Sequence, residues 1–222
     1  MKLFGFGKKE SAENSSPDFF ASLPTDYDKT ISGGLSKLKQ KYPDFSDFEF
    51  CEKVSNILIR IFSSVEDKDY SPVKPYISDY IIGGIEKEIQ YLKKENLTHR
   101  FDKLSVLNRS FSGCRISEEG DFAAADLTVR MTDYVIDGEG KIISGSKASE
   151  KFITYRVALS KNKKFSSYLK VREGAQNCPN CGAPVNINFS AVCEYCSSIL
   201  YTDDFDWIIE KISVIDKKEV TR

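Results

Sequence analysis

Residues 122–135 read FAAADLTVRMTDYV, and polar and apolar side chains alternate from Asp126 onward. A period of two is that of a β-strand with one face buried and the other exposed. Leu127, Val129 and Met131 are therefore expected on the buried face. The polar residues between them are expected on the other face: Asp126, Thr128, Arg130 and Thr132.

The chain on either side of this strand continues the pattern. The DGEG sequence at 137–140 is a strong turn signal, and residues 152–159 then alternate again. Residues 104–116 predict a weaker strand before the turn, and residues 168–172 a short one after it. The expected inward side chains of the strand at 152–159 are Ile153, Tyr155, Val157 and Leu159.

The residues before this run of strands have helical spacing. Ser46 and Glu49 form a capping box, in which each side chain satisfies a backbone N–H of the first turn, and Phe45 and Phe50 are placed to close over it. One apolar face follows. Cys51 belongs to this face, so its thiol is expected to be a small buried hydrophobe. The face consists of Cys51, Val54, Leu58, Ile61 and Phe62.

A second helix is predicted to begin at Ser71-Pro72, because serine caps helices and proline suits the first helical position. Gly83-Gly84 is expected to interrupt or bend it. A third apolar run then ends near Asn96. The members of that run are Ile81, Ile85, Ile89 and Leu92.

Helices followed by antiparallel strands indicate an α+β fold. Helices packed into a strongly bent sheet form a cone of the nuclear transport factor 2-like kind, although other α+β folds share this element order. The expected divisions are a flexible N-terminal segment (1–41), helices plus a curved sheet (42–174), a zinc ribbon insertion (175–200), a final strand (201–215) and a tail (216–222).

The first 41 residues are predicted to be weakly structured. SAENSSP at 11–17 is polar and turn-forming. The opening sequence KLFGFGKK at 2–9 mixes apolar residues with lysines. This opening fits a frayed tail, a docking peptide or a peripheral contact with a membrane surface.

The composition is that of an ordinary globular chain. It has 222 residues, 41% of them hydrophobic, and a net charge of −1, so no global basic field attracts nucleic acid. No apolar run approaches the roughly 18 residues of a membrane span, and the start lacks a signal-peptide core. Four of six cysteines form two close pairs, which favours metal binding in a reducing compartment, the cytoplasm.

Cys178, Cys181, Cys193 and Cys196 form two Cys-x-x-Cys pairs separated by eleven residues. Zinc takes four ligands at tetrahedral corners, and a two-residue spacer lets a tight turn aim both sulfurs at one point. Gly182 follows the first pair, where a turn with positive φ suits glycine. A redox motif would need one pair in a βαβ context. We predict one structural zinc ion, because four protein ligands leave no position for water.

Zinc ribbons often bind nucleic acid, but residues 175–207 contain no Lys or Arg. Basic residues make the phosphate contacts that supply most non-specific affinity. We therefore predict that the ribbon binds no nucleic acid. Its charged residues are Glu194, Asp203, Asp204 and Asp206.

Three motifs together resemble a known family: CPNCGAP at 178–184, CEYC at 193–196 and FDW at 205–207, with EKFITYR at 150–156 as a looser match. They resemble bacterial proteins that carry a Tim44-like domain, which is similar to the C-terminal domain of the mitochondrial inner-membrane import-motor scaffold, with a zinc knuckle inserted before the last strand. The resemblance spans about residues 45–214.

The resemblance implies the same cone, non-enzymatic binding, and contact with membranes or partner proteins through an apolar pocket. It also implies a strand at 205–214, although by spacing alone Ile208, Ile209 and Ile212 could equally lie on a helix. Many bacterial relatives have a transmembrane segment before the domain, and the mitochondrial scaffold has long basic N-terminal regions. This sequence shows neither, so the import role is not carried over.

The predicted function is non-enzymatic binding or scaffolding, with an apolar cone for a lipid, a peptide or a partner protein. Side chains that simply fill the cone are the structural alternative. The alternative function is a small-molecule isomerase or dehydratase of the ketosteroid-isomerase-like fold. Tyr91, Asp126, Asp133 and Tyr155 are suitable residue types without a motif, and His99 is expected at the surface near a helix C-terminus. We assign no catalytic residue.

Overall fold

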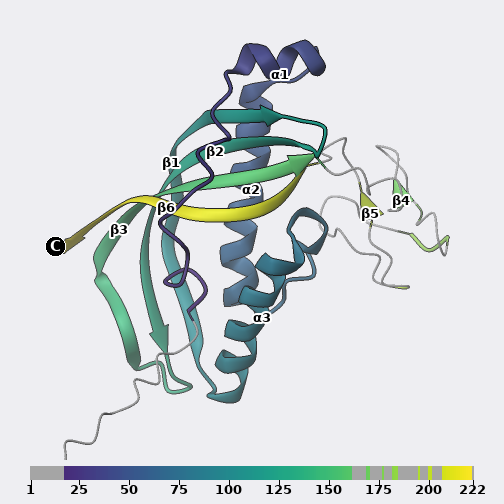
Figure 1. Ribbon diagram of the computed structural model, residues 1–222. Helices are drawn as coiled ribbons and strands as arrows, with labels where there is room; N and C mark the ends of the chain where they lie inside the picture. Colours follow the sequence, from purple (N-terminus) through teal and green to yellow (C-terminus); the bar gives the residue numbers. More distant parts are fainter. Residues whose placement is uncertain are drawn as a thin grey trace, which may run out of the picture.

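The computed structural model describes residues 18–161, 169–170, 177, 182–184, 195, 200–201 and 207–221. Helices come first and strands follow (Figure 1). The described elements are α1 (Leu35–Lys41), α2 (Asp47–Glu66), the 3-10 helix η1 (Lys74–Tyr76), α3 (Asp79–Lys94), β1 (Thr98–Ile116), β2 (Asp121–Ile136), β3 (Ile142–Lys161), β4 (Leu169–Lys170), β5 (Leu200–Tyr201) and β6 (Trp207–Thr221).

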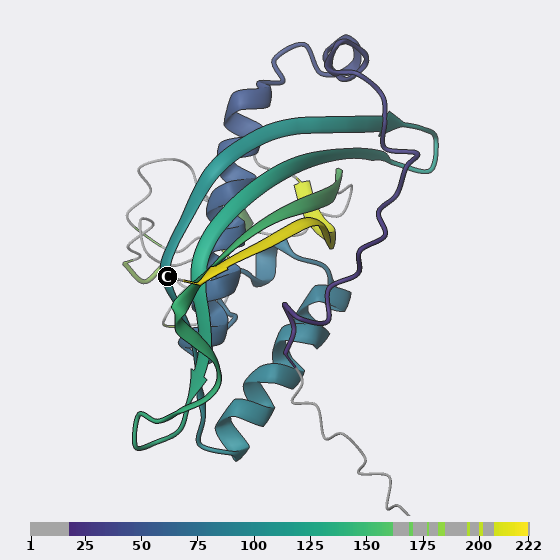
Figure 2. The same cartoon turned by 90° about the vertical axis from the view of Figure 1, so that its left-hand side faces the viewer.

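The four long strands form one antiparallel sheet in the order β1-β2-β3-β6, and β4 and β5 form a separate parallel pair. Leu127 of β2 lies opposite Tyr155 of β3, and Val157 of β3 lies opposite Ile212 of β6. Figure 2 shows the long strands bending strongly along their length. Each pairing contains register shifts, which are irregularities that bend strands. The α+β fold is confirmed, and it is consistent with a nuclear transport factor 2-like cone.

The last strand settles one alternative and corrects one boundary. β6 pairs with β3 from Trp207 to Thr221, so Ile208, Ile209 and Ile212 lie on a strand and not on a helix. The predicted tail at 216–222 is wrong for residues 216–221, because they continue this strand.

The apolar face of α2 packs into the core as predicted. The Ser46 hydroxyl oxygen accepts a hydrogen bond from the N–H of Glu49 at 3.3 Å, and the ring centroids of Phe45 and Phe50 lie 5.3 Å apart. These contacts confirm the predicted start of the helix. All five residues of the predicted face are buried: Cys51, Val54, Leu58, Ile61 and Phe62.

The second helix begins later than the sequence predicts. The Asp69 carboxylate accepts hydrogen bonds from the N–H of Ser71 at 2.9 Å and from its hydroxyl at 2.6 Å, which closes a turn at the expected helix start. After η1, Ile77 is extended and forms a bridge with Ile209 of β6. α3 therefore begins only after Ser78.

α3 runs unbroken through Gly83 and Gly84, so the predicted interruption is wrong. A Cβ on Gly84 would lie 2.6 Å from Cδ2 of Phe19, whereas a Cβ on Gly83 would meet nothing within 4 Å. Gly84 therefore gives the Phe19 ring room to pack against the helix. Asn96 ends the helix as predicted, with φ of 51°, a left-handed conformation typical of a helix C-terminus.

The prediction of a flexible segment over residues 1–41 is wrong for residues 18–41. Phe19 and Phe20 are each only 6% exposed and belong to the hydrophobic core. The ring of Phe20 stacks on Phe62 at a centroid distance of 4.0 Å and meets Phe101 edge-on at 5.2 Å. We call residues 18–34 the N-terminal strap.

Beyond its phenylalanines, the strap passes around the edge strand β6. The carbonyl of Pro24 accepts a hydrogen bond from the N–H of Val214 at 2.8 Å. The guanidinium of Arg156 then lies 4.2 Å from the ring centroid of Tyr27. Arg156 is a neighbour of the core residue Val157 and so points to the opposite sheet face. The strap therefore touches both faces, and it runs between α3 and α1 in Figures 1 and 2.

Candidate functional site

The four predicted zinc ligands, Cys178, Cys181, Cys193 and Cys196, lie outside the described residues. Their described neighbours agree with one detail of the prediction. Gly182 has a φ of 74°, which is the left-handed conformation expected of a glycine after the first pair. Asn177 and Pro184 form an antiparallel bridge, so the chain reverses direction between them.

The predicted inward side chains all lie in the packed core. None of them lines the concavity between residues 18–24 and α3 or the concavity beside the start of α2. Side chains of α2 and the strap phenylalanines belong to the same core cluster, so these inner faces are filled. The residues are Leu127, Val129, Met131, Ile153 and Val157, with exposed fractions between 0% and 6%.

The sequence predicts His99 at the surface, and this prediction is wrong. His99 lies at the start of β1 and is only 1% exposed. Its Nδ1 lies 2.6 Å from Oε1 of Glu88 on α3, and its Nε2 lies 2.8 Å from Oδ1 of Asp133 on β2. The ammonium of Lys151 on β3 donates to Oδ2 of Asp133 at 2.7 Å. We call these four residues the buried ionic cluster.

The buried ionic cluster holds its charges by mutual pairing. Burial disfavours a charge on His99, but the hydrogen bonds that its ring donates to Asp133 and Glu88 outweigh burial and raise the pKa of His99 to about 9. Burial also works against the Asp133 carboxylate, yet His99 and Lys151 hold the pKa of Asp133 below its ordinary value. At Glu88 burial dominates, and its pKa is raised.

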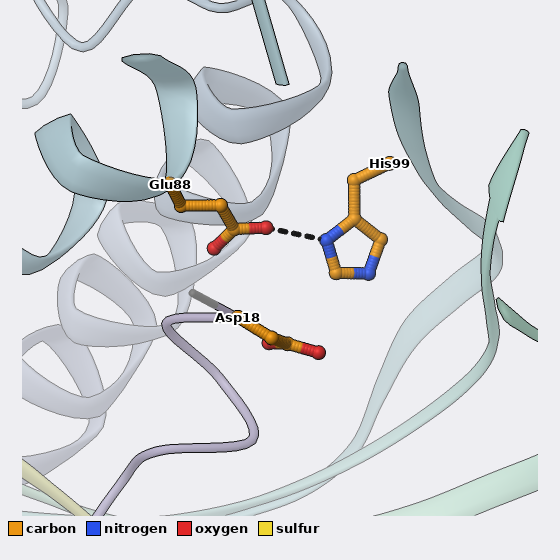
Figure 3. A group of neighbouring side chains, drawn as sticks. All are labelled: Asp18, Glu88 and His99. Carbon is orange, nitrogen blue, oxygen red and sulfur yellow. Dashed lines mark hydrogen bonds and ion pairs between the residues drawn. The ribbon is translucent and has the colours of Figure 1, made fainter. Parts of the chain in front are cut away.

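The strap contributes a third carboxylate beside this cluster. One ligand atom each of Asp18, Glu88 and His99 lies within 4.8 Å of the other two, a grouping able to hold a metal ion. In Figure 3 the Glu88 carboxylate points at a nitrogen of the His99 ring, and the Asp18 carboxylate lies below both side chains in this view. The N–H of Phe19 donates to Oε2 of Glu88 at 2.8 Å, which ties the strap to α3.

Sequence reasoning missed this cluster because its members lie on different elements. One local signal was present at Glu88. It lies three residues after Ile85 and four before Leu92, so it falls on the apolar stripe of α3 and is 2% exposed. A glutamate in such a stripe requires a buried partner.

The remaining candidate acid–base residues are dispersed. Asp126 forms a two-point ion pair with Arg156, at 2.7 and 2.6 Å, away from the cluster. Tyr155 is fully buried, and its hydroxyl has no hydrogen-bond partner among the described residues. Tyr91 is only partly buried at the edge of the core. Among the residues considered from sequence, the structure joins Asp133 to His99 by a hydrogen bond and places Tyr155 near enough to Asp133 for its charge to raise the pKa of Tyr155.

The concavities on the described part of the chain include two that could hold a ligand. The first, which we call the strap groove, has a volume of about 810 Å³ and lies between the strap and α3. The second has about 490 Å³ and lies beside the start of α2 and Trp207. The strap groove is lined by Asp18, Phe19, Ala21, Ser22, Leu23, Pro24, Asp79, Tyr80, Gly83, Gly84 and Lys87.

The fold is that of a helix-covered curved sheet with a filled interior and grooves at its margin. A protein-family model for the Tim44-like domain matches residues 31–171. The match covers more than half of the chain. The chain therefore belongs to the Tim44-like domain family. The matched span ends before the first predicted zinc ligand, Cys178. A comparison with curated proteins gave no match. Within the described residues, no helix is long and apolar enough to cross a membrane.

Proposed function

We propose that this chain is a non-enzymatic binding or scaffolding module of the Tim44-like type, carrying one structural zinc ion on Cys178, Cys181, Cys193 and Cys196. Membership of the Tim44-like domain family is the observation that carries the binding role. The spacing of the cysteines supports the zinc ion, and four thiolate ligands would close its coordination sphere. Reduced thiolates also support placing the chain in the cytoplasm.

The buried ionic cluster supports a binding role over the alternative of an isomerase or dehydratase. A general base must come within hydrogen-bond reach of its substrate. His99 and Tyr155 are 1% and 0% exposed, and neither lines the strap groove or the concavity beside Trp207. His99 is also engaged at both ring nitrogens. These groups therefore serve the fold, where they join α3 to the sheet.

The strap groove is the binding site that we propose, in place of an open cone. Its volume falls within the range typical of ligand pockets. Phe19, Leu23 and Tyr80 give it apolar walls, while Asp79 and Lys87 add charged groups. Charged groups can hydrogen-bond the backbone of a peptide but not a lipid tail. We therefore favour an apolar peptide segment of a partner protein as the occupant.

Gly83→Leu tests this site, because the new side chain would enter the groove where a Cβ meets nothing within 4 Å. The fluorescent probe anilinonaphthalene sulfonate reports on accessible apolar sites, and we expect the full chain to bind it saturably. Gly83→Leu should weaken binding at least about tenfold, a loss of about 1.4 kcal/mol. Asn56→Leu, which adds the same side chain at an exposed position of α2, should bind like the wild type.

Equal binding by wild type and Gly83→Leu would refute the groove as the site. Sedimentation with anionic phospholipid vesicles separates a lipid from a peptide. If Gly83→Leu abolishes co-sedimentation, the occupant is a lipid. The first nine residues would be responsible for any vesicle contact that the variant retains. A mobility-shift assay with DNA and RNA checks the proposed lack of nucleic-acid binding.

A further inference from the structure

We propose that Asp18, Glu88 and His99 form a second metal site, for a divalent transition-metal ion, which fastens the N-terminal strap to α3 and β1. The three residues come from separate elements, and their ligand atoms lie within 4.8 Å of one another. One imidazole and two carboxylates are a donor set that suits zinc or manganese. Nothing in this site draws on the four knuckle cysteines.

Each of the three side chains has its second polar atom held by a different partner. Nε2 of His99 is bonded to Asp133, the carboxylate–histidine arrangement that orients metal-binding imidazoles. Oε2 of Glu88 accepts the N–H of Phe19 at 2.8 Å. Oδ1 of Asp18 accepts the N–H of Ala21 at 2.9 Å. The atoms that would hold a metal ion are Nδ1 of His99 and Oε1 of Glu88, which bond to each other at 2.6 Å, and the second carboxylate oxygen of Asp18. Figure 3 shows the three side chains close together.

A divalent cation balances the charges of the site when all of its carboxylates are ionised. Ionised Asp18, Glu88 and Asp133 beside protonated His99 and Lys151 leave one negative charge uncompensated, and burial together with the charge of Asp18 raises the pKa of Glu88. A divalent ion that replaces the proton on Nδ1 leaves the imidazole neutral and the whole group electrically neutral. Metal binding requires neutral imidazole and ionised carboxylates. Charges buried without compensation are costly.

The Tyr155 hydroxyl is a further buried polar group close to these carboxylates. It is completely buried and has no hydrogen-bond partner among the described residues, which is rare for an interior polar group. After burial itself, the charges of Asp133 and Asp18 raise the pKa of Tyr155, so the hydroxyl lies in the field of these carboxylates.

The three ligand atoms must adjust their separations to accept the ion, from the present limit of 4.8 Å. Ligand atoms on a tetrahedral ion at about 2.0–2.1 Å lie about 3.3 Å apart. Nδ1 of His99 and Oε1 of Glu88, now 2.6 Å apart, must separate by less than about 1 Å. Because Asp18 precedes Phe19 directly, the ion would hold the strap phenylalanines in the core.

Manganese titration of the full chain, with the knuckle zinc in place, tests the proposal. Thiolates disfavour Mn²⁺ whereas carboxylates suit it, so loss of the free Mn²⁺ signal in electron paramagnetic resonance reports on this site. We expect one Mn²⁺ bound per chain. Asp18→Asn should weaken binding at least about tenfold, and the partly exposed Asp18 can be replaced without disturbing the core. Asp26→Asn, on the same strap but paired with Lys211, should bind like the wild type.

Zinc provides the second arm of this experiment. After equilibration with zinc, elemental analysis should find one more zinc ion per chain in the wild type than in Asp18→Asn. The proposal is overturned if Mn²⁺ shows no saturable binding and the zinc content of the two proteins is the same. It is also overturned if Asp18→Asn and Asp26→Asn bind Mn²⁺ equally well.

Discussion

Alanine should stabilise the protein at Gly83 but not at Gly84, although the two glycines are neighbours on one helix. Glycine in a helix interior is about 1 kcal/mol less favourable than alanine, so both variants gain the same stabilisation from helix propensity. At Gly83 nothing opposes that gain. At Gly84 the added Cβ would lie 2.6 Å from Cδ2 and 2.8 Å from Cε2 of Phe19.

The Phe19 ring cannot move away freely. Phe19 is buried, its N–H is bonded to Glu88, and its ring meets Phe20 edge-on at 5.2 Å. Overpacking of this kind costs about 1–3 kcal/mol. We expect Gly83→Ala to raise the free energy of unfolding by about 1 kcal/mol. Gly84→Ala should lie about 1–3 kcal/mol below Gly83→Ala.

Urea unfolding at equilibrium measures both variants against the wild type, and a constant slope with denaturant shows that the comparison is valid. The double variant Phe19→Ala/Gly84→Ala should remove the clash, so the two changes should not be additive. Equal stabilities of Gly83→Ala and Gly84→Ala, within about 0.5 kcal/mol, would show that the strap does not pack against α3 as described.

Three further predictions test the strap and the knuckle. Phe20→Ala should lower the free energy of unfolding by about 3–5 kcal/mol, whereas Phe48→Ala, at a 64% exposed position, should stay within about 0.5 kcal/mol of the wild type in the same urea assay. With the thiol reagent DTNB at pH 8, addition of a chelator should make four cysteines reactive. Cys51, whose pKa burial raises to about 11, and the buried Cys114 should react only after unfolding. Four thiols that react without chelator would exclude bound zinc. Cys181→Ser should abolish zinc binding in elemental analysis and leave cooperative unfolding of the sheet intact. Loss of cooperative unfolding in this variant would contradict a separately folded knuckle.

The parts of the fold that depend on local pattern could be predicted. The alternation in β2 and β3 and the Ser46 cap of α2 are determined by neighbouring residues, and each is present as expected. The start of α3 could not be read in the same way, because a side-chain turn at Asp69 and a bridge to β6 at Ile77 compete with the helix signal of Ser71-Pro72.

The strap and the buried ionic cluster depend on contacts between distant residues. Phe19 meets Glu88 across 69 positions, and the carbonyl of Asp26 meets Ser213 across 187. The strap sequence is rich in polar and turn-forming residues, so composition alone indicates a flexible segment. By local sequence His99 is a residue just after a helix end. The pairing of β1 with β2, which brings Asp133 beside it, cannot be read from neighbouring residues.

The location of the binding site is tested most directly by nuclear magnetic resonance of the full chain. The backbone amide signals are followed while anilinonaphthalene sulfonate is added. The strap groove predicts that the largest shifts fall on residues 18–24 and 79–87. Shifts concentrated instead on Leu127, Val129 and Met131 of the inner sheet face would show an open cone and contradict the account.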